Sequence, residues 1–182
     1  MKATGIVRRI GDLGRVVIPK EIRRTLRLRE GTPLEIFTDR EGEIILKKYS
    51  PMMELTAFSG QYAEAMAQSS GLMVCITDRD QVVAAAGGAK KDFFQKPISR
   101  ALEHVIQERM TVQAGKGERA FTPVTDDDGE GITAQVITPI ICEGDAIGAV
   151  IVMSRDPRMK FTESEVRLAA TAAGFLGRQM ES

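Results

Sequence analysis

The sequence predicts an α+β protein of two domains, and three observations indicate it. Short β-branched runs alternate with amphipathic helical patterns along the 182 residues. Tyr49-Ser50-Pro51 interrupts these patterns, because proline disfavours helix at the residue before it, so we expect domains at residues 1–50 and 51–182. The charges divide at the same place: the first segment holds 12 Lys and Arg against 7 Asp and Glu, and the second holds 13 against 18. This asymmetry predicts a first domain that binds a polyanion.

The first domain is expected to contain four short strands and one helix. Alternating polarity or β-branched residues indicate the strands, which lie at residues 4–10, 16–18, 34–37 and 43–48. Pro19 suits the first position of a helix, and Gly31 ends the unit that contains this helix. These elements make a thin core for about fifty residues, so we expect a dimer in which strands are shared.

Basic side chains dominate the start of the chain. Only Asp12 and Glu21 oppose them before Glu30, and the basic residues are Lys2, Arg8, Arg9, Arg15, Lys20, Arg23, Arg24, Arg27 and Arg29. A run of charges usually forms a solvated, salt-bridged face, but here few local ion-pair partners are available. A guanidinium group binds phosphate oxygens or a guanine edge through two hydrogen bonds. We therefore expect this segment to bind DNA.

A signature lies within this basic segment. TGIVRRIGDLGRVVIPKEIRRTL resembles the AbrB family of bacterial transition-state regulators, which carry a Leu-Gly-Arg-x-x-Ile-Pro core followed by a basic helix. The resemblance implies a swapped-hairpin β-barrel formed by a homodimer through residues 1–50. It also implies that arginines of both protomers contact double-stranded DNA at promoters. The positions that match the contacting residues are Arg8, Arg9, Arg15, Arg23 and Arg24.

Antitoxins share this small fold and provide an alternative interpretation. Under that interpretation the chain is an antitoxin-like or ligand-sensing binding module that acts mainly through protein partners. Antitoxins usually carry a short toxin-binding tail, whereas over a hundred residues with a globular pattern follow the first domain here.

The second domain is expected to contain an antiparallel sheet between helices. A helical stripe that ends at Gly71 opens it, and Thr162 and Glu165 form a capping-box pattern that starts the last helix. A further amphipathic helix is marked by residues between Ile98 and Arg109. Strands are predicted at residues 72–78, 81–87, 121–124, 133–141 and 146–154. This layout resembles a GAF-like α/β sensor domain.

Two helical seams follow from the spacing of apolar residues by three and four. The first helix carries Leu55, Phe58 and Tyr62, and the last carries Val166, Ala169, Ala173, Leu176 and Met180. Such seams suit flanking bundle helices that join two dimers into a homotetramer. They equally suit helices that cover the sheet of their own domain.

The pairing of the two domains resembles a family of late sporulation transcription factors from spore-forming bacteria. The matching stretches are Lys48–Pro51, Gly144–Val150 and Thr171–Glu181. The resemblance implies a regulator that activates some forespore-stage promoters and represses others. It also implies the tetramer described above.

A GAF-like domain could hold a small molecule between its sheet and the covering segments. The polar candidates near residues 87–94 and on the following helix are Lys90, Lys91, Asp92 and Arg100. A solvated loop is the competing interpretation of the same residues. No ligand or cofactor can be named from the sequence.

Other classes of function find no support in the sequence. There is no GxSxG elbow, no phosphate-binding glycine loop and no paired-histidine motif, so we expect no enzyme and no catalytic residues. His104 is the sole histidine, and Cys75 and Cys142 lie in apolar runs, so we expect neither a metal site nor a disulfide. No apolar run reaches the length of a membrane span. We therefore expect a cytoplasmic, nucleoid-associated protein.

Overall fold

The computed structural model describes residues 5–49, 56–127 and 131–181, and it divides the chain into two compact units, residues 1–49 and 50–182. Each unit is described by itself below. None of the described helices is both long and apolar enough to cross a membrane.

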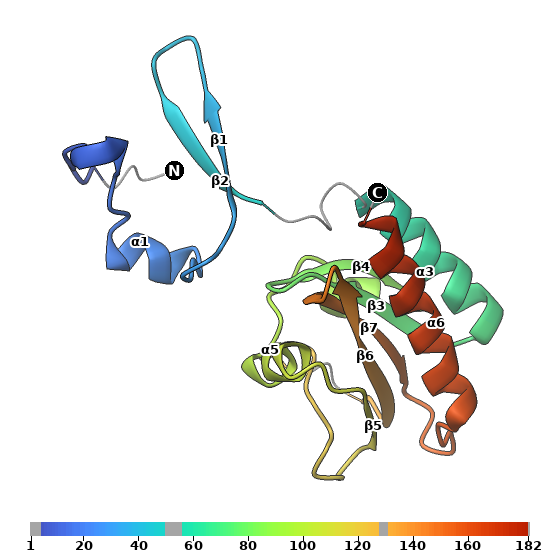
Figure 1. The fold of residues 1–182 in the computed structure, drawn as a ribbon. Coiled ribbons are helices and arrows are strands. Elements are labelled where there is room, and N and C mark those ends of the chain that lie inside the picture. Colours follow the sequence, from blue (N-terminus) through green and yellow to red (C-terminus); the bar gives the residue numbers. More distant parts are fainter. Residues whose placement is uncertain (1–4, 50–55, 128–130, 182) are drawn as a thin grey trace. The chain divides into compact units, whose positions relative to one another are not determined.

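The N-terminal unit contains two short helices and one hairpin (Figure 1). The 3₁₀-helix η1 spans Asp12–Gly14 and α1 spans Lys20–Thr25. Strands β1 (Leu34–Thr38) and β2 (Ile44–Lys48) pair antiparallel, which confirms the predicted hairpin. Asp39 shapes its turn, because its Oδ1 accepts the backbone N–H groups of Glu41 and Glu43 at 3.0 and 2.8 Å.

The two strands predicted before α1 are absent from the described residues of this chain. Residues 5–10 and 15–18 form no ladder, and Thr4 lies outside the described residues. The physical reason is a missing neighbour, since a strand needs a second strand to receive its backbone hydrogen bonds. The apolar side chains here are also uncovered: Val7 is 91% exposed and Leu13 is 87% exposed. Among residues 5–49, Pro19 alone is buried.

The C-terminal unit is built on a five-stranded antiparallel sheet in the order β4-β3-β7-β6-β5. Its strands are β3 (Met73–Thr77), β4 (Val82–Ala86), β5 (Val112–Gly115), β6 (Ala134–Cys142) and β7 (Asp145–Ser154). β6 and β7 form a long hairpin at the centre, with Ala134 opposite Ser154 and Cys142 opposite Asp145.

Helices cover both faces of this sheet (Figure 1). Helices α3 (Thr56–Ser70) and α6 (Glu163–Gln179) bury one face. Helices α4 (Lys90–Phe93) and α5 (Arg100–Gln107) bury the other. Successive strand residues alternate between the two cores, with Val74 and Ile76 under α3 and Cys75 facing the opposite core. Burial on both faces explains why these strands are apolar almost throughout.

Most predicted elements of this unit are confirmed, with three differences. The capping box is present, with the Thr162 side chain accepting from Ser164 N and Glu165 accepting from Thr162 N. Residues 121–124, predicted as a strand, form an irregular segment instead. β5 and the four-residue helix α4 were not predicted, because each is too short to show a clear period.

The predicted bundle seam is wrong for the buried part of α6. Ala169, Ala173 and Leu176 are 0, 3 and 0% exposed and lie in the core beneath α6, so they cover the sheet of their own domain. The remaining described seam residues are half-buried at the edge of the same core, and they are Phe58, Tyr62, Val166 and Met180. Leu55 lies outside the described residues.

Candidate nucleic-acid interface

The basic unit is shaped by the turn at Gly11–Arg15. Gly11 N donates to Arg15 O at 2.8 Å, and Gly14 N donates to Gly11 O at 3.2 Å. Leu13 and Gly14 both have positive φ, 64° and 72°. Glycine adopts this left-handed backbone conformation without a Cβ clash. This explains the glycine before the arginine in the Leu-Gly-Arg core. Two backbone hydrogen bonds therefore hold the turn that carries the Arg15 side chain.

Helix α1 supports two more of the five predicted contacts. It begins after Pro19 and places Arg23 and Arg24 in its last turn. Leu28 N closes the helix end by donating to Arg23 O at 2.7 Å, with Arg27 in the left-handed region at φ 51°. Basic side chains in the last turn of a helix are favoured by the helix dipole.

The five predicted DNA-contacting arginines share one property. Within the described part of the chain, each is exposed and makes no ion pair, and they are Arg8, Arg9, Arg15, Arg23 and Arg24. Three arginines of the C-terminal unit do make ion pairs: Arg155 pairs with Asp92, Arg158 with Asp156, and Arg167 with Glu163. The N-terminal unit thus presents guanidinium groups whose donors are available to phosphate oxygens or base edges.

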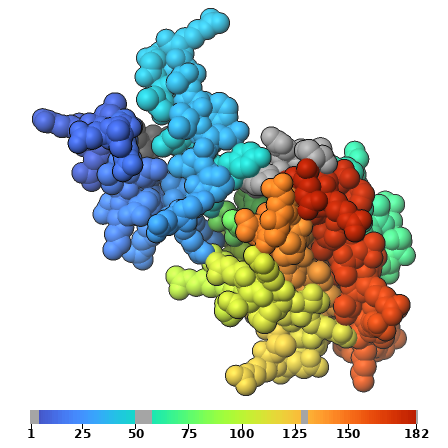
Figure 2. Space-filling model, in the orientation of Figure 1, coloured from blue at the N-terminus to red at the C-terminus, as the bar shows by residue number. Residues whose placement is uncertain are grey.

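Figure 2 shows the β1–β2 hairpin projecting as a narrow arm of the N-terminal unit. Its faces carry exposed apolar side chains, including Ile36, Phe37, Ile44 and Leu46. A single copy of this unit therefore exposes basic side chains but has no hydrophobic core that would fix their positions.

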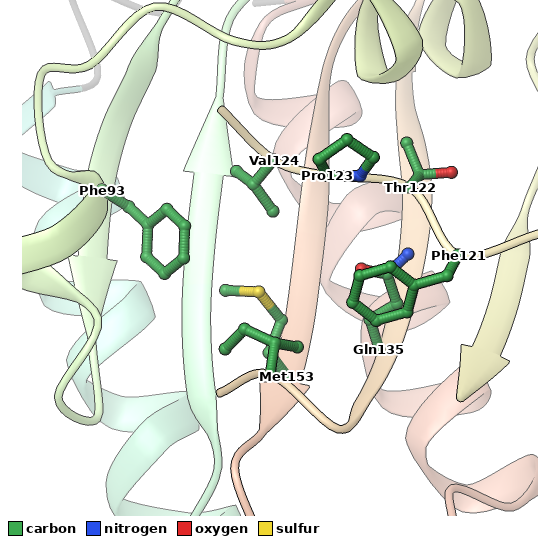
Figure 3. A pocket seen from close by; sticks show the side chains of 8 residues that line it. Phe93, Phe121, Thr122, Pro123, Val124, Gln135 and Met153 are labelled. Atoms are coloured by element: carbon green, nitrogen blue, oxygen red, sulfur yellow. The ribbon is translucent and has the colours of Figure 1, made fainter. Parts of the chain in front are cut away.

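The C-terminal unit contains a small, partly open cavity of about 10 Å³ (Figure 3). Its walls come from α4, β6, β7 and the irregular segment 121–124, and the lining residues are Phe93, Phe121, Thr122, Pro123, Val124, Ile132, Gln135 and Met153. Gln135 is 1% exposed, and its Nε2 has no hydrogen-bond partner. Apolar side chains thus dominate among the lining residues, and Thr122 and Gln135 add polar side chains.

The polar residues predicted to bind a ligand do not line this cavity. Lys91 and Arg100 are exposed, while Lys90 lies over the Phe94 ring and borders a separate open groove against α3. Asp92 is bonded to Arg155, and this hydrogen bond lowers the pKa of the Asp92 carboxyl below its usual range.

The residues that line the cavity were missed by sequence reasoning. One signal was available: a glutamine in the mostly apolar run Ala134–Ile141 stands at a position that a doubly buried strand would fill with a hydrophobic residue.

Comparison with known families agrees with both units. Residues 54–181 match the model described as stage V sporulation protein T C-terminal, transcription factor, and residues 7–53 match the model of the MazE antitoxin, described as antidote-toxin recognition. The C-terminal fold is similar to the GAF domain of the nutrient sensor CodY from Clostridium difficile, with a TM-score of 0.52 and 15% identity over 70% of this chain and 92% of that one. The molecule is thus of the class of transcription factors with an AbrB-like N-terminal domain and a GAF-like C-terminal domain.

Relatives define the family more closely. The chain is 52% identical over 181 residues to stage V sporulation protein T of Bacillus subtilis, covering 100% of this chain and 99% of the relative. Its first part is 62% identical over 53 residues to the transition state regulatory protein AbrB of the same organism, covering 29% of this chain and 54% of AbrB. The chain belongs to the stage V sporulation protein T family, and it is a transcription regulator of sporulation.

Proposed function

We propose that the chain binds promoter DNA through Arg8, Arg9, Arg15, Arg23 and Arg24, and that it activates some late forespore genes and represses others. The observation that supports this proposal is the set of exposed, unpaired arginines on a unit that is 62% identical to AbrB over 53 residues. DNA binding of this kind would hold the protein on the nucleoid in the cytoplasm.

The DNA-binding form in this proposal is a dimer with interleaved N-terminal units. Residues 5–10 and 16–18 of each protomer gain their strand partners from the other protomer, forming a swapped-hairpin barrel. The uncovered apolar side chains support this assembly, because burying surfaces such as those of Val7, Ile10 and Val17 is favourable by about 25 cal/mol per Å².

Replacing Arg15 and Arg23 together with alanine tests the proposal. Fluorescence anisotropy with a forespore promoter fragment should show a loss of binding. The slope of log affinity against log salt should fall by about one for each phosphate group that no longer pairs with an arginine. Arg158→Ala is the matched control, because Arg158 is exposed and lies in the C-terminal unit. Equal affinity and equal salt dependence in the double variant would contradict the proposal.

We propose further that the C-terminal units join two dimers into a tetramer. Phe58 and Tyr62 on α3 lie against Phe175 on α6, with ring centroids 5.9 and 5.4 Å from that of Phe175, and Phe175 is exposed. This aromatic edge takes the place of the buried seam residues as the contact. Sedimentation should show a tetramer that Phe175→Lys converts to a dimer, whereas a dimeric parent protein would refute this assembly.

A second candidate function is that of an antitoxin-like module acting through a protein partner. The match of residues 7–53 to an antitoxin model favours it. It requires a stoichiometric protein partner and only weak, sequence-blind DNA binding. Affinity purification from sporulating cells that returns no such partner would count against it.

We also propose that the GAF-like domain senses a small molecule. The cavity at Gln135 supports this, and calorimetry of the full chain with sporulation-phase metabolite extracts is the first test.

A further inference from the structure

Leu13 is an apolar side chain that strand pairing between two copies does not cover. It is 87% exposed, whereas no large hydrophobic side chain in the described part of the C-terminal unit is more than 45% exposed. Val7 and Val17 are exposed as well, but they belong to residues 5–10 and 16–18, which gain strand partners in the dimer proposed above. Leu13 lies between these two segments, so it needs a different explanation.

The backbone holds Leu13 within a tight turn. Gly11 N donates to Arg15 O at 2.8 Å, and this bond closes a loop that contains residues 12–14. Leu13 has φ 64° and ψ 21°, in the left-handed region that is unfavourable for a residue with a Cβ. Glycine at this position would avoid both this cost and the exposure of an apolar side chain to water. A contact between the leucine and another molecule explains why the turn carries both costs.

The charges around the turn indicate which molecule this is. Arg15 ends the turn, and Arg8 and Arg9 lie a few residues before it. Within the described part of the chain, all three are exposed and make no ion pair. Guanidinium groups of this kind complement the phosphate oxygens and base acceptors of DNA. We therefore take duplex DNA as the partner of Leu13.

Asp12 indicates which part of the duplex the turn meets. Its side chain is exposed directly before Leu13, and phosphate groups repel a carboxylate. Base edges in the major groove offer better partners for both residues: the cytosine amino group donates to carboxylates, and the C5-methyl group of thymine makes apolar contacts. The tip of the turn thus suits the floor of the major groove better than it suits the phosphate backbone.

We propose that Leu13 contacts the C5-methyl group of a thymine in the major groove and thereby contributes to sequence preference. The arginines supply most of the affinity, and each Leu13 of the dimer favours sites with thymine at one position. The inference rests on the DNA binding proposed above, and it adds a residue that distinguishes bases to the arginines that hold the duplex.

The experiment removes the methyl group from the DNA without changing base pairing. Fluorescence anisotropy of the full chain compares a forespore promoter fragment with the same fragment in which deoxyuridine replaces every thymidine. The parent protein should lose about fourfold in affinity for each methyl group that Leu13 covers, or roughly fifteenfold for a dimer with two such contacts. The slope of log affinity against log salt should stay the same, because no phosphate contact is lost.

Variants connect this loss to Leu13. Leu13→Ala should bind the thymidine fragment as weakly as the parent binds the deoxyuridine fragment, and the exchange should change its affinity by less than about twofold. Leu13→Gly suits the positive φ of the turn and is the second variant if Leu13→Ala folds poorly. Leu13→Met keeps a large apolar side chain and should retain most of the response. Met110→Ala is the matched control and should respond as the parent does, because Met110 is an exposed apolar residue of the C-terminal unit.

Three results would overturn the inference. Equal binding of both fragments by the parent would mean that no side chain reads a thymine methyl group. A full loss in Leu13→Ala would assign the methyl contact to another residue. A weaker dimer of Leu13→Ala in sedimentation without DNA would place Leu13 inside the protein interface. Failure of the DNA-binding proposal looks different, because the parent would then bind both fragments no better than the variant that lacks Arg15 and Arg23.

Discussion

The two cysteines differ in burial and therefore in the reactivity of their thiols. Cys75 lies fully buried in β3, and burial raises the pKa of its thiol far above the usual range. Cys142 ends β6 and is half-buried, and its pKa is raised by burial first and then by the nearby carboxylates of Glu143, Glu181 and Asp145. Since the thiolate is the reactive form, both thiols are protected from oxidation, Cys75 almost completely.

Thiol labelling should separate the two sites. In the native protein a disulfide reagent should modify Cys142 and leave Cys75 untouched. At pH 8 the rate at Cys142 should lie below that of free cysteine and should keep rising above pH 9, because the raised pKa delays formation of the thiolate. Glu143→Gln should increase the rate at pH 8 by removing one negative neighbour. A rate at Cys142 equal to that of free cysteine would contradict the raised pKa.

At the scale of elements, one glycine determines how closely α6 lies on the sheet. A Cβ on Gly177 would stand 2.1 Å from the backbone oxygen of Ile141, so glycine at this position allows the helix to approach β6. Gly174, one turn earlier, has nothing within 4 Å of its Cβ position. Close packing against β6 therefore requires glycine at position 177 but not at position 174.

Alanine at these two positions should change stability in opposite directions. Gly177→Ala should lower the free energy of unfolding by about 1–3 kcal/mol, because α6 must move off β6. Gly174→Ala should raise it by roughly 0.5–1 kcal/mol, because alanine favours helix and meets open space. Urea unfolding followed by circular dichroism measures both. A neutral Gly177→Ala would show that the close approach of α6 to Ile141 is not required.

Some helices, strands and contacts between them could be predicted from the sequence, and others could not. The β1–β2 hairpin and the capping box at Thr162 were predicted correctly, because turn residues and caps act locally. The seam on α6 was misassigned because spacing identifies an apolar face but not the surface that covers it. Gln135 was missed for a related reason. It lines the cavity together with residues 121–124, and these residues are close to it only in the folded chain.

At the scale of the whole molecule, the cores are distributed unequally. The C-terminal unit holds two clusters of buried residues, whereas Pro19 is the one buried residue among residues 5–49. A unit without a core cannot offset the conformational entropy of ordering its chain. In the dimer proposed above, association supplies this order, and the basic face is completed where two copies meet.

This dependence on association predicts that hydrogen exchange in the full chain will vary with protein concentration. On dilution below the dimer dissociation constant, amides of Leu34–Thr38 and Ile44–Lys48 should lose protection, because stability that comes from association falls with protomer concentration. Amides of β6 and β7 should keep their protection, because both faces of that sheet are covered within one chain. Val17→Asp should shift the loss to higher concentration by placing a charge among the apolar side chains that associate, and Glu41→Asp is the control at the exposed hairpin turn. Protection of β1 and β2 that stays constant across all concentrations would show that the N-terminal unit folds alone.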